Sequence, residues 1–178
     1  MKIKFFYPCL IAAVLAIPTA ASAQDPRDVR LADEIASAVL RYAQLGIFDD
    51  INASVENGAV ILTGKVTTPY KKSDLHKRIE RIDGVRSLRN DVDVLSVSIH
   101  DEDLRYRVAR AIYGNPSFWS YASMANPPIH IIVERGRVTL TGVVSSNVER
   151  MLARSLATGL GELSVTNALR TDAEIKSE

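Results

Sequence analysis

Residues 57–66 read Asn57-Gly58-Ala59-Val60-Ile61-Leu62-Thr63-Gly64-Lys65-Val66, and residues 135–144 read Arg135-Gly136-Arg137-Val138-Thr139-Leu140-Thr141-Gly142-Val143-Val144. The stretches lie 78 residues apart and share a glycine, a valine, a Leu-Thr-Gly sequence and a final valine. Asn-Gly between two apolar runs is a strong hairpin signal, because both residues tolerate positive φ. The sequence therefore predicts a β-hairpin that occurs twice.

The repeat extends beyond this hairpin on both sides. Upstream, at an offset of 73, four apolar residues find counterparts: Leu31, Ile35, Ala38 and Val39 correspond to Leu104, Val108, Ala111 and Ile112. Downstream, Gly84 and Asn90 correspond to Gly161 and Asn167 at an offset of 77. Since the offset rises from 73 to 78, the second copy carries five additional residues before its first strand. Self-similarity of this kind indicates a duplicated structural unit.

The first half of each copy is expected to be a helix followed by a strand. Apolar residues recur every three or four positions from Leu31 to Tyr42, which predicts an amphipathic helix beginning near Asp28. Residues 51–55 then alternate between apolar and polar, as in a half-buried strand that leads into the hairpin.

A second helix and a last strand complete each copy. Thr68 and Pro69 are suited to the N-cap and the first helical position, and Ser146 and Glu149 have the spacing of a capping box. The expected buried stripes are Leu75, Ile79 and Ile82 in one helix and Val148, Leu152 and Leu156 in the other. Final strands are expected over residues 88–94 and 163–169.

The fold class that follows is α+β, with two tandem α-β-β-α-β modules over residues 28–96 and 101–171. A strand–helix–strand link favours a right-handed crossover, so each module is expected to be a three-stranded sheet with both helices on one face. Because a sheet of this size is marginal alone, we expect the two modules to pack together.

The first 23 residues have the layout of a cleavable signal peptide. Lys2 and Lys4 precede an apolar run from Phe5 to Ile17, and Ala21-Ser22-Ala23 offers small residues for cleavage before Gln24. The run is shorter than the roughly 20 residues of a membrane span. We therefore expect an exported, periplasmic protein.

Charge and cysteine content narrow the possible functions. The chain has 22 basic and 21 acidic residues, and loss of Lys2 and Lys4 leaves 20 and 21, a net charge of −1. Near-neutrality argues against a nucleic-acid binder. The only cysteine, Cys9, lies near the start of the apolar run rather than at its end, so a lipoprotein is not expected.

The repeated pattern resembles the BON domain, a family named for bacterial osmotically inducible and nodulation proteins. The residues that carry the resemblance are Gly58, Val60, Leu62, Thr63, Gly64 and Val66, and again Gly136, Val138, Leu140, Thr141, Gly142 and Val144. Glu162 departs from the family, which usually has an apolar residue there. The resemblance implies a periplasmic or outer-envelope module without catalysis, associated with envelope or osmotic stress and with phospholipid surfaces.

No residue pattern predicts catalysis, a metal site, a cofactor or a small-molecule substrate. The histidines are His76, His100 and His130, and none has the spacing of a metal site. We interpret Gly58, Gly64, Gly136 and Gly142 as structural residues. At Gly64 and Gly142 a glycine allows a bulge or a close approach by the following helix.

The segment from Asn115 to Pro128 is the strongest candidate for a contact with a partner. It contains Phe118, Trp119 and Tyr121 around the five-residue expansion. Two interpretations are open: the aromatics fill the core or the contact between modules, or they anchor the protein at a membrane interface.

Basic side chains near these aromatics are candidates for the same contact. They are Arg105, Arg107 and Arg110. A basic helix with Lys71, Lys72, Lys77, Arg78 and Arg81 is interpreted as a solvated face, with weak lipid-phosphate docking as the alternative.

The expected function is docking on a phospholipid membrane surface. The alternative is a protein–protein interaction adaptor that uses a free sheet edge. A purely structural envelope protein is a third possibility.

Overall fold

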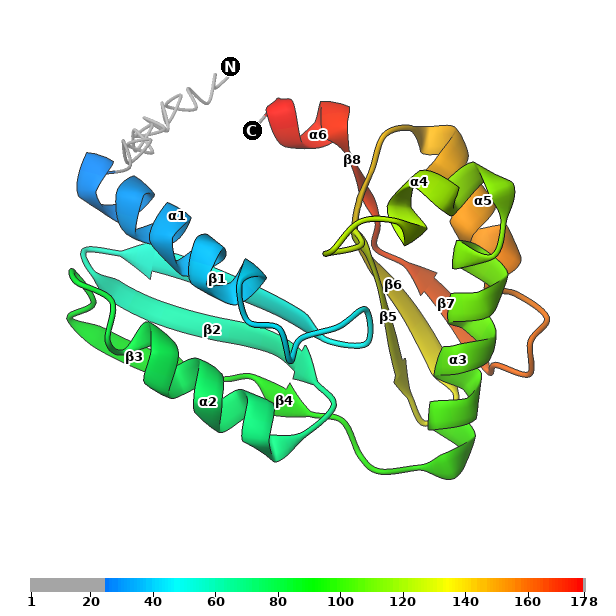
Figure 1. Ribbon diagram of the computed structural model, residues 1–178, viewed down its shortest axis with the longest axis horizontal. Coiled ribbons are helices and arrows are strands. Elements are labelled where there is room, and N and C mark those ends of the chain that lie inside the picture. Colours follow the sequence, from blue (N-terminus) through cyan, green and yellow to red (C-terminus); the bar gives the residue numbers. More distant parts are fainter. Residues whose placement is uncertain (1–24, 178) are drawn as a thin grey trace, which may run out of the picture.

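The computed structural model describes residues 25–177 and contains two α/β modules joined by a short linker (Figure 1). The elements of the first module are α1 (Pro26–Leu40), β1 (Asp50–Glu56), β2 (Ala59–Val66), α2 (Pro69–Ile79), β3 (Ser87–Asn90) and β4 (Asp93–Val94). Those of the second are α3 (Ile99–Tyr113), η1 (Pro116–Phe118), α4 (Trp119–Ala122), β5 (Ile129–Glu134), β6 (Arg137–Val144), α5 (Asn147–Leu156), β7 (Ser164–Asn167), β8 (Arg170–Thr171) and α6 (Asp172–Lys176). The predicted α+β class with two tandem modules is confirmed. The expected signal peptide lies outside the described residues.

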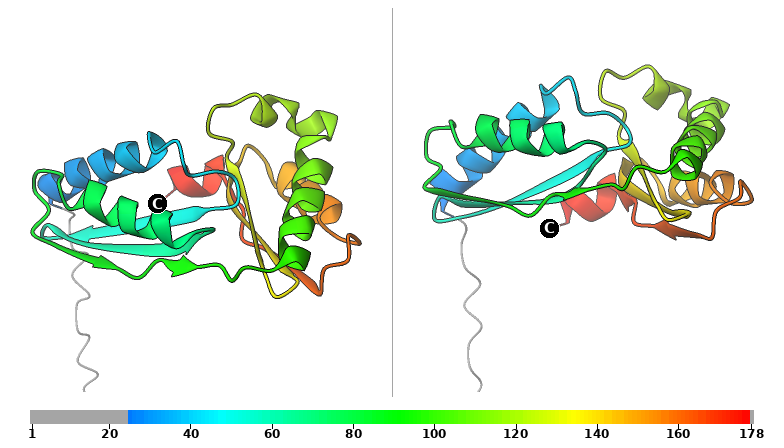
Figure 2. Two further views of the ribbon diagram at one scale, coloured as in Figure 1. Left: turned by 60° about the horizontal axis from the view of Figure 1, so that its bottom comes forward. Right: turned by 90° about the horizontal axis from the view of Figure 1, so that it is seen from below.

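Each sheet has its longest strand in the middle. In the first module β1 runs antiparallel to β2, with Ile51 opposite Gly64, and β3 and β4 run parallel to β2. The second module repeats this arrangement with β5, β6, β7 and β8. Figure 2 shows α1 and α2 on one face of their sheet.

The last strand of each module is interrupted, where one continuous strand was expected. Asn90 lies at the break: its Nδ2 donates to the carbonyl of Lys72 at 3.0 Å, and its Oδ1 accepts from the Val92 N–H at 3.2 Å. Asn167 repeats both bonds with Arg150 and Leu169. The side chain thus fastens the end of the strand to the preceding helix, at the point where the ladder is interrupted.

The hairpin turns have the backbone conformation that the sequence predicted. Asn57 and Gly58 have φ of 51° and 75°, and Arg135 and Gly136 have 51° and 71°. The carboxylate of Asp101 accepts the N–H groups of Arg135 and Gly136, both at 2.8 Å. Asp28 does the same for the first hairpin. The first helix of each module therefore holds its own hairpin by two charge-assisted bonds.

Gly64 and Gly142 are confined by backbone at the start of the neighbouring strand, and not by the following helix, which was one of the two alternatives expected. Their φ values are 116° and 105°. A Cβ would lie 2.1 Å from the Asp50 carbonyl oxygen in one and 1.9 Å from the Pro128 carbonyl oxygen in the other. Both features favour glycine.

The two cores differ in how they are filled. Leu75 and Ile79 of α2 are buried in the first core, and their counterparts in α5 are Ala153 and Ala157. Phe118, which is completely buried, belongs to the same cluster as these alanines. The expansion of the second module thus adds a bulky side chain to a core in which the second helix buries two alanines.

The modules contact each other through the loop before β1. The Ile131 N–H of β5 donates to the Ile47 carbonyl at 2.7 Å, so the loop occupies part of this sheet edge. The Phe48 ring packs edge-on against Tyr106, with centroids 5.3 Å apart. Lys65 and Glu134 form an ion pair.

Candidate functional site

The aromatic segment folds into a short helical cap on the second module. Asn115 begins η1 by accepting the Ser117 N–H at 3.0 Å, and Pro116 occupies the first helical position. Phe118 then points into the core with no exposed surface, while Trp119 remains 75% exposed. Phe118 is therefore not a surface contact, which corrects the membrane interpretation for this residue.

Tyr121 attaches the cap to α5. It is partly buried against the core, and its hydroxyl donates to Oε2 of Glu149 at 2.8 Å. The same hydroxyl accepts the Ser145 N–H at 3.0 Å. Burial raises the pKa of Tyr121, so the hydroxyl keeps its proton and remains a donor to Glu149. Tyr121 thus supports the position of the cap, and its contact with lipid stays a prediction.

Glu149 leaves the predicted capping box half-formed. Ser146 caps α5 by accepting the Glu149 N–H at 3.3 Å. The Glu149 carboxylate, however, accepts the Ser145 N–H at 3.0 Å instead of returning to Ser146. Burial acts to raise the pKa of Glu149, but the bonds from Tyr121 and Ser145 outweigh it and lower that pKa below its usual value.

Helix α5 places two more large apolar side chains in solvent. Val148, which the sequence placed in the buried stripe, is 75% exposed, and Met151 one turn later is 65% exposed. Val148 adjoins Glu149, to which the cap is bound through Tyr121. We call Trp119, Val148 and Met151 the α4–α5 surface.

Arginine side chains lie beside Met151 of this surface. Met151, Arg150 and Arg154 line one shallow groove. Arg150 is bound to Glu174 of α6 at 2.8 Å. The Arg154 side chain is exposed and has no ion pair within residues 25–177.

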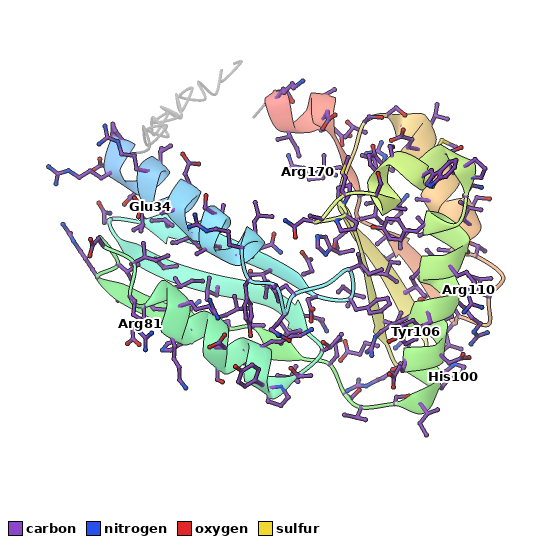
Figure 3. The ribbon with its side chains drawn as sticks, in the orientation of Figure 1. Glu34, Arg81, His100, Tyr106, Arg110 and Arg170 are labelled. Carbon is purple, nitrogen blue, oxygen red and sulfur yellow. The ribbon has the colours of Figure 1, made fainter. Side chains whose placement is uncertain are left out.

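The three arginines predicted beside the aromatics have different environments. Arg105 is buried and donates to the Val133 carbonyl at 2.8 Å, so it is not a surface contact. Arg107 pairs with Asp103 at 3.1 Å and also donates to the Leu160 carbonyl. Arg110 is exposed and points away from the first module, whereas Tyr106 lies on the facing side of α3 (Figure 3).

Two basic side chains of α2 in the first module bind partners within the same module. Lys71 Nζ lies 2.7 Å from Oδ2 of Asp49, which is buried. Arg78 pairs with Asp74 at 2.7 Å and lies over the Tyr42 ring, 4.5 Å from its centroid. These contacts favour a structural role for α2.

Sequence reasoning missed a second exposed apolar group, at the hairpin end of the second module. Val97, Ile99 and Leu163 are 98%, 88% and 74% exposed. Leu163 covers Gly136, and Ile99 begins the helix whose Asp101 binds the same turn. We call these three residues the hairpin-end surface. Ile99, an apolar residue at the first position of α3, was the sequence feature that could have indicated this exposed group.

Similarity to known proteins follows the same division into modules. A profile of the BON domain family matches residues 27–96 and again residues 100–173. The chain belongs to the BON domain family. Its first and second BON domains are the two modules described above. The resemblance to this family, which rested on the glycine-containing hairpins, is confirmed.

Two solved structures match most of the chain at low sequence identity. One comes from structural studies of CdsD, a structural protein of the type III secretion system of Chlamydia trachomatis, with 15% identity and a TM-score of 0.29; the match covers 83% of this chain and 96% of that one. The other is the C-terminal domain of CdsD, with 14% identity, a TM-score of 0.28, and coverage of 77% and 94%. No curated protein gives a significant match.

Residues 25–177 include neither a candidate membrane span nor a candidate metal-binding cluster. None of the helices in this range has the length and apolar character needed to cross a membrane. The same range holds no group of three or more His, Cys, Asp or Glu side chains that is able to bind a metal ion.

Proposed function

We propose that this protein is an exported, non-catalytic periplasmic protein whose second BON domain docks on phospholipid membrane surfaces in envelope or osmotic stress. The observation that carries the proposal is the 75% exposure of Trp119 on a cap whose neighbouring aromatics are buried or bonded. An indole held outward by a fixed support suits the membrane interface, where its apolar body and polar N–H are both satisfied.

Val148 and Met151 extend the area available for burial. Removing apolar surface from water stabilises a complex by roughly 25 cal/mol per Å². Three large side chains therefore supply a few kcal/mol if partly inserted, which is on the scale of reversible docking. Arg110 and Arg154 add cations for lipid phosphates, and the small net charge leaves apolar burial as the main contribution.

The proposal is tested with vesicles of phosphatidylcholine that contain increasing fractions of phosphatidylglycerol. Trp119 is the only tryptophan, so its emission reports on this surface alone. We expect a blue shift on vesicle addition and weaker co-sedimentation of Trp119→Ala at unchanged thermal stability.

The repeat provides a matched control. Tyr70 of α2 occupies the position equivalent to Val148 and is 65% exposed. Tyr70→Ala is expected to bind vesicles like the wild type, and Val148→Ser to bind less. Equal binding by Trp119→Ala and the wild type contradicts the proposal.

Export is tested separately by the intact mass of the protein recovered from cells. We expect a chain that begins at or near Gln24 and carries no acyl group. A mass that includes residues 1–23, or a diacylglycerol addition, contradicts this assignment.

The alternative, an interaction adaptor, is favoured by the hairpin-end surface. Leu163 stands where the first BON domain has Arg86, which covers Gly58 in the equivalent way. A photo-crosslinking residue at position 163 is expected to capture one defined envelope protein if this alternative holds. The same residue at position 86 is the control.

A further inference from the structure

A cavity of about 380 Å³ lies between the two BON domains. Val39, Leu45, Ile47 and Ile51 line it from the first domain, and Pro127 and Pro128 line it from the second. Its volume is within the range of small-molecule sites, and its aliphatic lining is typical of them. No residue of the α4–α5 surface belongs to its wall.

Two hydrogen bonds between the domains bracket this cavity. At one side the Ile131 N–H donates to the Ile47 carbonyl at 2.7 Å. At the other, Asn126 Nδ2 donates to the Leu40 carbonyl at 3.4 Å. The expansion of the second domain, through residues 125–128, thus forms one wall, and the cavity depends on the contact between the two domains.

A polar atom in the wall lacks a partner. His130 lines the cavity, and its Nδ1 is inaccessible to solvent and makes no hydrogen bond within the described residues. The hydroxyl of Thr141, opposite His130 on β6, also lacks a partner but is not part of the wall. A buried polar group without a bond is costly, so His130 gains if its ring turns Nδ1 toward a hydroxyl or ether oxygen of a ligand in the cavity.

The charges around the cavity select against an anionic ligand. The negative charge of Asp49 in the wall is already balanced, because Asp49 forms an ion pair with Lys71 at 2.7 Å. It also accepts the Gly46 N–H at 2.9 Å. Asp50 also lines the cavity and has no ion pair within residues 25–177. A carboxylate or phosphate beside Asp50 is repelled.

We propose that the cleft between the BON domains binds the aliphatic chain of an uncharged single-chain amphiphile, whose polar end lies near His130. This site is independent of membrane docking through the α4–α5 surface. It accounts for the apolar lining, for the unbonded Nδ1 of His130 and for the acidic Asp50 in the wall.

Gly46 offers a way to fill the cavity without strain. It lines the wall, its φ is outside the left-handed region, and an added Cβ meets no atom within 4 Å. Gly46→Leu is therefore expected to fold normally while its side chain takes the place of the aliphatic chain. Leu163→Ser, at the opposite end of the second domain, is the matched apolar control.

The test uses calorimetric titration with dodecyl maltoside below its micelle concentration, in the absence of vesicles. We expect one molecule to bind per chain, and dodecanoate, which has a similar chain and a negative charge, to bind at least tenfold more weakly. Gly46→Leu should weaken dodecyl maltoside binding at least tenfold, whereas Leu163→Ser and Trp119→Ala should not change it.

Three results overturn the proposal: no binding by the wild type, equal binding by Gly46→Leu, or loss of binding in Trp119→Ala. If Gly46→Leu melts at a lower temperature, wild-type nuclear Overhauser contacts decide instead. Contacts between the dodecyl chain and the Ile51 methyl groups support the site, and their absence overturns it. Vesicle binding by Gly46→Leu should stay normal, which separates this proposal from membrane docking.

Discussion

The Tyr121 hydroxyl donates a 2.8 Å hydrogen bond to the Glu149 carboxylate and thereby fixes α4 on the N-terminal end of α5. In the first BON domain the position of Glu149 is occupied by Lys71, which binds Asp49 instead. Both modules thus have a polar link from the first turn of their second helix. The link is Lys71 to Asp49 in the first module and Glu149 to Tyr121 in the second. In the second BON domain this link holds the short helix that begins at Trp119.

Replacing Tyr121 by Phe removes this link and leaves the ring in place. Glu149 and the Ser145 N–H both lose a partner, so we expect the free energy of unfolding to fall by about 1–2 kcal/mol. Urea denaturation followed by circular dichroism measures the change. Tyr106→Phe, at an exposed site on α3, is the control and should change stability by less than about 0.5 kcal/mol.

The same link makes the stability of the cap depend on pH. The pKa of Glu149 is lower in the folded protein than in the unfolded chain, so the unfolded chain binds the proton more readily. This contribution is present above the ordinary glutamate pKa and is lost as the pH falls through the folded-state value. Comparing unfolding of the wild type and Glu149→Gln between pH 7 and pH 3 tests it. Parallel stability curves would assign the acid sensitivity to other carboxylates.

Gly142→Val is expected to destabilise the second BON domain. A side chain at φ 105° is strained, and its Cβ would lie 1.9 Å from the Pro128 carbonyl oxygen. We expect a loss of about 1–3 kcal/mol in thermal or chemical unfolding. Gly46→Ala meets no neighbouring atom and serves as the control. Similar melting of both variants would show that the backbone relaxes around residue 142.

Phe118→Ala is expected to cost about 3–5 kcal/mol, because it removes the largest fully buried side chain of the second core. A second substitution tests why this aromatic is there. Ala153→Leu restores the residue that α2 has at the equivalent position, and we expect it to recover part of the loss in the Phe118→Ala background. By itself it should destabilise, because the core is already full. Additive effects of the two substitutions would argue that Phe118 and residue 153 do not share one space.

The sequence by itself determined the duplicated fold. The Leu-Thr-Gly hairpins, the caps at Thr68 and Ser146 and the paired Asn90 and Asn167 are local signals, and local backbone preference is enough to interpret them. These signals also gave the order of helices and strands, because each of them marks the start or end of an element within a few residues.

The tertiary structure alone decided which aromatic and basic side chains are available to a partner. Phe118 and Arg105 are buried while Trp119 and Arg110 are exposed, although all four come from one stretch of chain. Phe118 is buried in the core cluster to which α5 contributes only the small side chains of Ala153 and Ala157 among its fully buried residues. Val148 is exposed because the same helix turns its alanines, and not its valine, toward the sheet. Such choices depend on contacts between segments far apart in sequence, so no local pattern carries them.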